Sequence, residues 1–264
     1  MRLPYFQVDV FTPRTFGGNA AGVCPLREWL PTEVMQTIAA ENNLAETAFY
    51  VPAADGFELR WFTPTMEIDL CGHATIAPAL VLFQEYGLPG DAVRFRTRSG
   101  LLTAARREGF IELDFPARPG APCPVPPPAL AAGLGRTPVA VFKARDYLAV
   151  FESAEEVAAL RPDFRVLAEV DCLGVIATAP GAEPGTDFVS RFFAPRAGVD
   201  EDPATGSSHC TLIPYWAGRL DRTKMFARQL SRRGGEIHCE FRGERVGIGG
   251  AAVVYSRGEL TLPG

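Results

Sequence analysis

The sequence predicts an α+β protein built from two similar domains, each a mostly antiparallel sheet wrapped around one central helix. Runs of alternating apolar and polar residues, typical of half-buried strands, occur in both halves of the chain. Each half also contains one helix-like segment that is apolar on most faces, as a buried helix is. A proline-rich stretch separates the halves.

That stretch, "FPARPGAPCPVPPPA", covers residues 115–129. Proline lacks a backbone N–H group and has a fixed φ, so the stretch cannot be a central strand or a helix interior. We therefore expect an extended linker between an N-terminal domain of residues 1–117 and a C-terminal domain of residues 118–264. The last strand could instead return to the N-terminal domain.

The first half is rich in strand patterns and has two helix patterns. Strands are expected at "YFQVDVF" and "FELRWFT", and "VRFRTRSGLLTAARREGFIELDF" predicts a three-stranded antiparallel meander with turns at Ser99-Gly100 and Glu108-Gly109. One helix is expected near "PTEVMQTIAAEN", with Thr32 as its N-cap and Glu33 in its first turn. The central helix should begin near His73 and end at "YGLPG".

The second half repeats this scheme. Its strand-like runs are "PVAVFKARDYLAVF", "VIATAP", "DFVSRFFAP", "GEIHCEF" and "AAVVYS", and its central helix is "TGSSHCTLIPYWAGRL". Each central helix contains a proline, Pro78 or Pro214, which removes one hydrogen bond and is expected to kink the helix.

Composition narrows the functional classes. The 264-residue chain has a formal net charge of −5 and no basic tail or stripe, which argues against nucleic acid as the main partner. The N-terminus lacks the apolar core of a signal peptide, and no apolar run approaches the roughly 20 residues of a membrane helix. The six cysteines are scattered, without the close spacings of a disulfide framework. We expect a soluble, cytoplasmic protein that does not bind membranes.

Two turns lead into the central helices, at Gly72-His73 and at Gly206-Ser207. The first N–H groups of a helix have no partner within the helix and carry partial positive charge. Each helix start could therefore bind a carboxylate or phosphate group. Alternatively, the glycines only allow the chain to turn into the helix.

Acidic residues supply the candidate acid–base groups. In "NLAETAFYV", Glu46 shares a strand face with small and apolar neighbours, which favour the protonated carboxyl and suit it to general acid–base catalysis. A solvated glutamate on an exposed face is the alternative. In "GVDEDPATGSSHC", Asp202 is the acid closest to the second helix turn, and Ser207 and Ser208 add hydroxyls. These acids could instead cap the helix.

The sequence does not indicate a metal or nucleotide cofactor. Each of the three histidines has a nearby cysteine, but no C-x-x-C pair and no H-x-x-x-H pattern is present. The glycines of "FGGNAAGV" are not followed by the helix and acidic residue of a dinucleotide-binding unit. We therefore expect no metal site and no dinucleotide cofactor.

Taken together, these residues resemble the phenazine-biosynthesis PhzF-like family of isomerases. The matching stretches occur in the family's order and span nearly the whole chain: "FQVDVFTPRTFGGNAAGV", "NLAETAFY", "RWFTPTMEIDLCGHAT", "DEDPATGS" and "QLSRRGG". The resemblance implies the diaminopimelate-epimerase-like fold, with the active site between the two domains, no metal or organic cofactor, and a homodimer.

The resemblance also implies roles for individual residues. Glu46 matches the family's acid–base glutamate, and His73, Asp202 and Ser207 match residues that assist it. We expect Glu46, His73 and Asp202 to be catalytic. The residues expected to bind substrate are Asn19, Gly72, Gly206 and Ser207.

The predicted function is a cofactor-independent isomerase that moves a proton or double bond on a small carboxylate-bearing metabolite. One alternative is an amino-acid epimerase or racemase, which uses two cysteines as opposed bases. Cys71 occupies the first cysteine position of that mechanism, but Thr205 stands in the second. The other alternative is a non-catalytic small-molecule-binding protein on the same fold.

Overall fold

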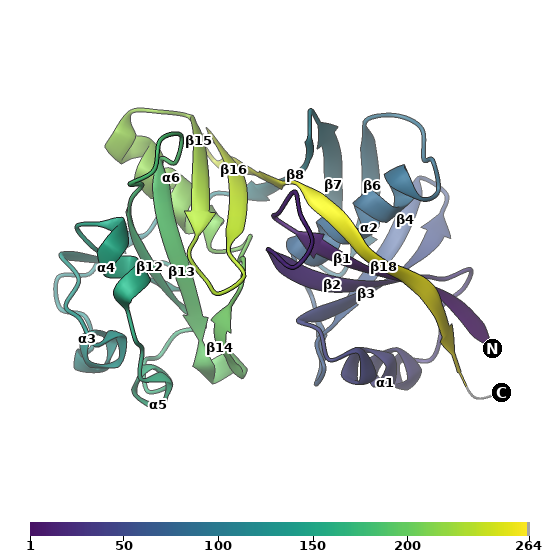
Figure 1. Ribbon diagram of the computed structural model, residues 1–264, viewed down its shortest axis with the longest axis horizontal. Coiled ribbons are helices and arrows are strands. Elements are labelled where there is room, and N and C mark those ends of the chain that lie inside the picture. Colours follow the sequence, from purple (N-terminus) through teal and green to yellow (C-terminus); the bar gives the residue numbers. More distant parts are fainter. Residues whose placement is uncertain (263–264) are drawn as a thin grey trace. The chain divides into compact units, whose positions relative to one another are not determined.

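The computed structural model describes residues 1–262, which form two compact units (Figure 1). Unit 1 contains residues 1–114 and the chain from 249 onward, and unit 2 contains residues 115–248. The division lies three residues before the expected boundary, and the last strand groups with unit 1. Residues 263 and 264 of the expected C-terminal domain lie outside the described residues.

Unit 1 has a mostly antiparallel sheet. Its strands pair in the order β18-β1-β2-β3-β4-β6-β7-β8, with the short β5 beside β4, and only the β2–β3 and β4–β6 pairs are parallel. The strand bounds are β1 Arg2–Val10, β2 Asn19–Pro25, β3 Glu46–Ala53, β4 Gly56–Phe62, β5 Glu67–Ile68, β6 Ala92–Thr97, β7 Gly100–Arg107, β8 Phe110–Pro116 and β18 Ala252–Thr261. The meander and both of its expected turns are confirmed, with Gly100 and Gly109 at positive φ.

The central helix of unit 1 is α2 (His73–Gln84), and it lies against β1, β2, β3, β7 and β18 (Figure 1). Nine of its 12 residues are buried, as its lack of a polar face predicted. The amphipathic helix α1 (Thr32–Asn42) packs on β3 and β4, where Met35, Ile38 and Phe49 form an apolar cluster. Strand β3 is therefore covered on both of its faces.

Unit 2 also has a mostly antiparallel sheet, and more helices cover it than cover the sheet of unit 1. Its strands pair in the order β9-β10-β11-β12-β13-β15-β16, with β14 also beside β13, and the β11–β12 and β13–β15 pairs are parallel. The bounds are β9 Ala121–Pro122, β10 Ala140–Lys143, β11 Tyr147–Val150, β12 Val175–Pro180, β13 Phe188–Ala194, β14 Val199–Asp202, β15 Lys224–Gln229 and β16 Gly235–Arg242. Strand β17 (Arg245–Gly250) spans the second boundary between the units.

The two faces of the unit 2 sheet are covered by different helices. On one face the central helix α6 (His209–Leu220) places Trp216 on Phe188 and donates the Trp216 Nε1–H to Thr178 Oγ1 at 2.9 Å. On the other face, the alternating side chains of β12 and β13 form an apolar cluster with three short helices (Figure 1). These helices are α3 Pro128–Leu134, α4 Ala154–Ala159 and α5 Phe164–Leu167, and the sequence analysis missed all three.

Both central helices continue through their prolines because outside donors replace the missing N–H groups. Pro78 leaves the carbonyl of Ala74 without its helical partner, and Trp61 Nε1 donates to that oxygen at 3.0 Å. Pro214 likewise leaves the carbonyl of Cys210 without its helical partner, and the Arg118 backbone N–H donates to that oxygen at 2.8 Å. Each freed carbonyl is thus satisfied within its own unit.

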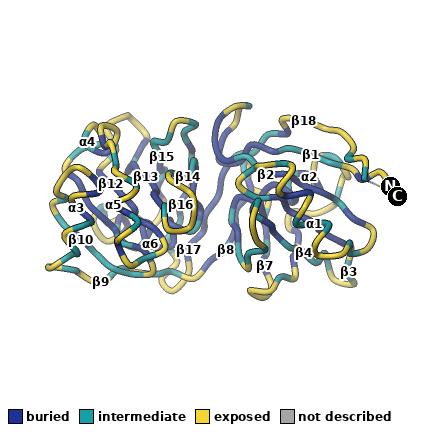
Figure 2. Tube along the Cα trace, turned by 90° about the horizontal axis from the view of Figure 1, so that it is seen from below, coloured by how far each residue is buried: buried dark blue, intermediate teal, exposed yellow. Residues whose placement is uncertain are grey.

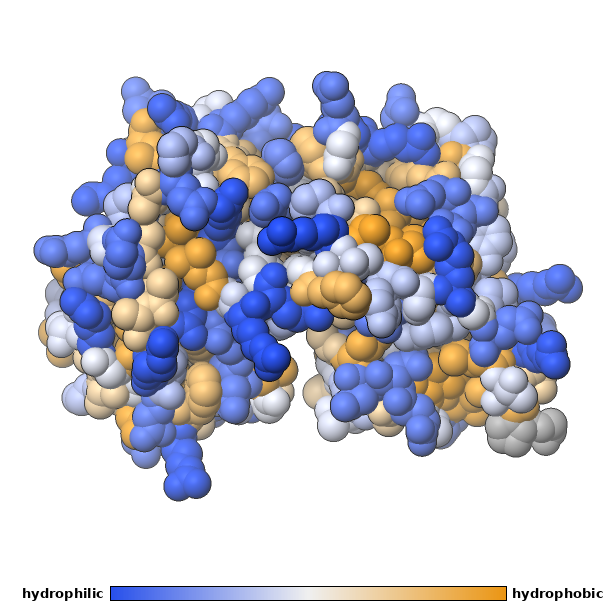
Figure 3. Space-filling model, viewed as in Figure 1, coloured by the Kyte–Doolittle hydropathy of each residue, from blue (hydrophilic) through white to orange (hydrophobic). Residues whose placement is uncertain are grey.

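One local prediction was wrong. The N-cap of α1 is Pro31, not Thr32, and no side chain caps this helix. The Thr32 hydroxyl instead accepts a hydrogen bond from Arg60 at 3.0 Å. Buried residues concentrate in the inner strands and in the central helices α2 and α6, whereas most loop residues are exposed (Figure 2). Hydrophilic side chains cover most of the face seen in Figure 3. Over residues 1–262, no helix has the length and apolar character needed to cross a membrane.

Candidate active site

In unit 1, three elements begin close together and supply the site. Strands β2 and β3 run parallel, with Ala21 opposite Glu46, so Asn19 and Glu46 point to the same face of the sheet. Asn19 and Glu46 are the first residues of these strands, and His73 is the first residue of α2. Parallel pairing thus brings the starts of two strands to the start of the buried helix.

Glu46 and His73 face each other closely. Glu46 Oε2 lies 3.0 Å from His73 Nε2, and the two side chains are only 15% and 6% exposed. By geometric criteria, neither Glu46 Oε2 nor His73 Nε2 has a hydrogen-bond partner among the described residues. We therefore treat the pair as an ion-pair contact in which both atoms keep hydrogen-bonding capacity. The structure does not place Glu46 on a solvated strand face.

The second ring nitrogen of His73, Nδ1, also has polar neighbours. His73 Nδ1 lies 3.4 Å from Asn19 Nδ2 and 3.5 Å from Cys71 Sγ. Both neighbours can donate, through the amide NH₂ and the thiol, so Nδ1 accepts when the ring is neutral, whereas in the imidazolium Nδ1 also carries a proton. The proton of the neutral ring then resides on Nε2, facing Glu46. Asn19, expected to bind substrate, is 1% exposed and contacts the catalytic candidate His73.

Burial and neighbouring charges set the protonation of His73 and Cys71. Burial disfavours the charged imidazolium, but the neighbouring Glu46 carboxylate favours it, and the pKa of His73 is raised above its ordinary value. Burial, with the Glu46 charge, raises the pKa of the Cys71 thiol, and His73 and the Ala74 N–H oppose this only in part. Cys71 is therefore a thiol at neutral pH, and His73 is the cationic partner of Glu46.

Glu46, Cys71 and His73 together could also hold a metal ion, because one ligand atom from each lies within 4.8 Å of the others. A metal would need the Cys71 thiolate, which burial disfavours. Our expectation of a site without metal stays a prediction.

In unit 2, Asp202 belongs to a separate polar network. The Thr205 hydroxyl donates a short hydrogen bond to Asp202 Oδ2, and Gln229 Nε2 donates to the Asp202 backbone oxygen at 2.7 Å. Gln229 Oε1 accepts from the Thr205 N–H at 2.8 Å. Asp202 does not cap α6, whose N-cap is Ser208. The side chain of Gln229, 1% exposed, thus fixes the turn that leads into the helix.

The start of α6 presents hydrogen-bond donors. Residues 206–208 form a turn closed by the His209 N–H on the Gly206 oxygen at 3.0 Å. Ser207 Oγ accepts from Arg145 Nη2 at 3.2 Å. Arg145 was missed by the sequence analysis, and the only signal for it is a charged pair in the middle of the strand-like run "ARDYLAVF".

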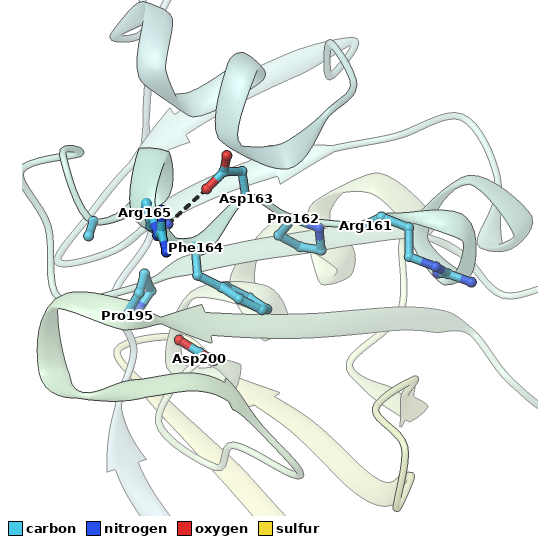
Figure 4. Close-up of a pocket in the computed structure, with 8 residues that line it drawn as sticks. Arg161, Pro162, Asp163, Phe164, Arg165, Pro195 and Asp200 are labelled. Atoms are coloured by element: carbon cyan, nitrogen blue, oxygen red, sulfur yellow. Dashed lines mark hydrogen bonds between the residues drawn. The ribbon is translucent and has the colours of Figure 1, made fainter.

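The structure therefore brings together Asn19, Glu46 and His73 in unit 1, and Asp202 with the Gly206-Ser207 turn in unit 2. A surface depression of about 720 Å³ elsewhere in unit 2 includes none of these residues (Figure 4). Its Asp163 carboxylate accepts from the N–H groups of Arg165 and Val166 and so caps α5. We therefore do not place the active site there.

Comparisons with known proteins agree with the resemblance. Residues 8–258 match the family described as "Phenazine biosynthesis-like protein". An uncharacterized isomerase of Pseudomonas aeruginosa is 50% identical over 264 residues, which cover 99% of this chain and 100% of the relative. The crystal structure of a phenazine biosynthesis protein of the PhzF family from Enterococcus faecalis has a TM-score of 0.96 at 45% identity and covers 99% of this chain and 100% of its own.

A more distant structure shows how widely the fold extends. A hydroxyproline epimerase from Agrobacterium vitis has a TM-score of 0.63 at 13% identity, with 98% of this chain and 92% of that chain covered. At this identity the likeness shows the fold alone. The expected diaminopimelate-epimerase-like fold, two similar sheet-around-helix domains, is confirmed.

Proposed function

Because the chain belongs to the phenazine biosynthesis-like family of isomerases, we propose that it moves a proton, and with it a double bond, on a small metabolite that carries a carboxylate. Glu46 is the proton-transferring group, His73 its partner, and no metal or organic cofactor takes part. The observation that carries this proposal is the nearly buried Glu46–His73 pair, whose facing atoms lie 3.0 Å apart and keep unused hydrogen-bonding capacity.

The charge on His73 suits Glu46 to act first as a base. The Glu46 carboxylate, held beside His73, can accept a proton from a carbon next to an unsaturated or carbonyl group. The electron pair of the broken C–H bond then enters the conjugated system of the substrate. The negative charge that develops there requires donors such as helix-start N–H groups. In the part of the chain that is described, the N–H groups of Gly72 and His73 donate to no backbone carbonyl.

The same pair can then return a proton. Once Glu46 is protonated, its attraction no longer supports the imidazolium, while burial still opposes that charge. The pKa of His73 therefore falls when the substrate has lost its proton, and His73 becomes a stronger acid. Either Glu46 or His73 delivers a proton to a different carbon, and the pair returns to its starting charges.

Asp202, Gly206 and Ser207 serve the same reaction in this proposal. Asp202 relays or returns the proton, and the turn at Gly206-Ser207 binds the carboxylate. Groups that act in one chemical step are strongly non-additive when they are removed. The Glu46→Gln/Asp202→Asn double variant should therefore be little slower than the slower single variant. Independent, multiplying losses would separate Asp202 from the reaction.

The epimerase alternative requires a thiolate at Cys71. The raised pKa of the buried thiol disfavours that role, and the Thr205 hydroxyl in the second base position donates to Asp202. We therefore retain the Glu46-based reaction.

The direct test is proton exchange with solvent. The protein would be incubated in deuterated water with a set of small amino and hydroxy acids, including cyclic unsaturated ones, and deuterium at carbon followed by NMR. We expect deuterium at the reacting carbon of a carboxylate-bearing substrate. Binding of such compounds without exchange would instead favour a non-catalytic binding protein.

We also propose a cytoplasmic homodimer. Six free cysteines support a reducing compartment. The dimer rests on the family resemblance and is tested by light scattering during size-exclusion chromatography, where a single monomeric mass would contradict it.

A further inference from the structure

Arg145 lies in the turn between β10 and β11, where the Ala144 N–H donates to the backbone carbonyl oxygen of Asp146 at 3.0 Å. Its guanidinium reaches Ser207 at the start of α6, with Nη2 at 3.2 Å from Ser207 Oγ. The Arg145 side chain is 36% exposed, so it remains accessible while it makes this contact.

The donors of this guanidinium are only partly used. Nε and Nη2 both donate to Asp146 Oδ2, at 3.4 and 3.2 Å, and Nη2 also donates to Ser207. Among the residues that the structure describes, Nη1 has no acceptor for its two N–H groups. Because Ser207 Oγ accepts from Arg145, the Ser207 hydroxyl proton is left to donate elsewhere.

Asp146 holds the guanidinium in this position. Its side chain is 2% exposed, and its second oxygen, Oδ1, has no hydrogen-bond partner in the described part of the chain. Arg145 is thus the only charged partner shown for a buried carboxylate, which fixes the plane of the guanidinium. Loss of all charge at Arg145 would leave Asp146 buried and unpaired, whereas lysine would keep the charge.

Apart from the buried Asp146 Oδ1, the free groups at this position are donors: the two Nη1 N–H groups, the Ser207 hydroxyl, and the N–H groups of residues 206–208, which have no acceptor among the described residues. A carboxylate is an acceptor only, with two oxygens, and it matches such a set, whereas a carboxamide presents an NH₂ to it. We propose that Arg145 recognises the substrate's carboxylate and that Asp146 positions Arg145 for this role. This inference rests on the proposed function, because it names the residue that selects a carboxylate-bearing substrate.

The test uses benzoate, a carboxylate on a flat ring, and benzamide as its neutral counterpart. The amide signals of Gly206, Ser207 and Ser208 would be followed by NMR in the full chain, up to about 50 mM ligand, which saturates a site of millimolar affinity. Wild type should bind benzoate and discriminate against benzamide. Arg145→Gln should weaken benzoate binding about tenfold and remove the discrimination, and Arg145→Lys, which keeps Asp146 paired, should weaken it at least about threefold.

Arg136→Gln is the matched control, because Arg136 is also a partly exposed arginine paired with a carboxylate, Glu156, in unit 2. It should bind benzoate like wild type. No benzoate-induced shift at residues 206–208 in wild type, or equal binding by wild type and Arg145→Lys, would overturn the inference. Glu46→Gln should bind benzoate normally. Loss of benzoate recognition therefore defeats only the role of Arg145, whereas full turnover by Glu46→Gln defeats the proposed function.

Discussion

Trp61 should stabilise unit 1 by replacing the hydrogen bond that Pro78 removes from α2. The indole is 1% exposed and donates to the Ala74 oxygen at 3.0 Å. In Trp61→Phe this buried carbonyl loses its partner, which costs about 1–3 kcal/mol of the free energy of unfolding. The smaller ring adds a packing loss of about 1 kcal/mol or more. The total loss should be about 2–4 kcal/mol.

A second substitution separates the two effects. In Pro78→Ala, residue 78 regains an N–H that can donate to the Ala74 oxygen, so Trp61→Phe should then cost only its packing loss. The coupling between the two substitutions should be about 1–3 kcal/mol, measured by urea unfolding followed by far-UV circular dichroism. The reasoning would be refuted if Trp61→Phe cost the same in both backgrounds, within about 0.5 kcal/mol.

Three further outcomes are expected. Burial lowers the pKa of His209 to about 4 in the folded protein, whereas the pKa in the unfolded chain is about 6.5. The stability that the neutral His209 contributes is therefore fully present above pH 6.5 and declines as the pH falls to about 4. His209→Asn should remove about 2.4 kcal/mol of this acid sensitivity between pH 7 and pH 4.5, measured by urea unfolding at the two pH values, and an unchanged pH dependence would contradict it. Cys71→Ser should keep activity within about tenfold of wild type, because Glu46 is the base, whereas its abolition with an intact fold would favour the epimerase mechanism. Gln229→Leu should lose about 2–3 kcal/mol of stability by thermal unfolding, because the N–H of Thr205 loses its buried acceptor, and a loss below about 0.5 kcal/mol would oppose this.

Much of the fold could be predicted because it depends on local patterns. The turn glycines of the meander and the apolar character of the two central helices identified those elements correctly. The short helices α3, α4 and α5 were missed because a helix of four to seven residues has too few turns for a clear apolar period. The parallel β2–β3 pair and the pairing of β18 with β1 join distant segments, so no local signal specifies them.

The prediction of Thr32 as a cap failed for a similar reason. A threonine at a helix start can cap it, but Thr32 lies one position inside α1 and its hydroxyl meets Arg60 from β4. The tertiary contact, which the sequence does not reveal, decided the outcome.

The site was predictable residue by residue but not in its contacts. Apolar neighbours and the "AET" motif singled out Glu46, and the helix start singled out His73. The contact of Asn19 with His73 Nδ1 depends on how β2 lies against α2. Arg145 was missed because an arginine in a hairpin turn is usually solvated, and its contact with Ser207 joins residues 62 positions apart.

The central claim is that Glu46 transfers the proton, and Glu46→Gln tests it most directly. This variant keeps the shape of the side chain but removes its titrating group. On a substrate identified by deuterium exchange, the rate of exchange should fall at least about a hundredfold while substrate affinity changes little. Glu41→Gln, the same change at an exposed residue of α1, should exchange at the wild-type rate. Near-wild-type exchange by a correctly folded Glu46→Gln would contradict the account.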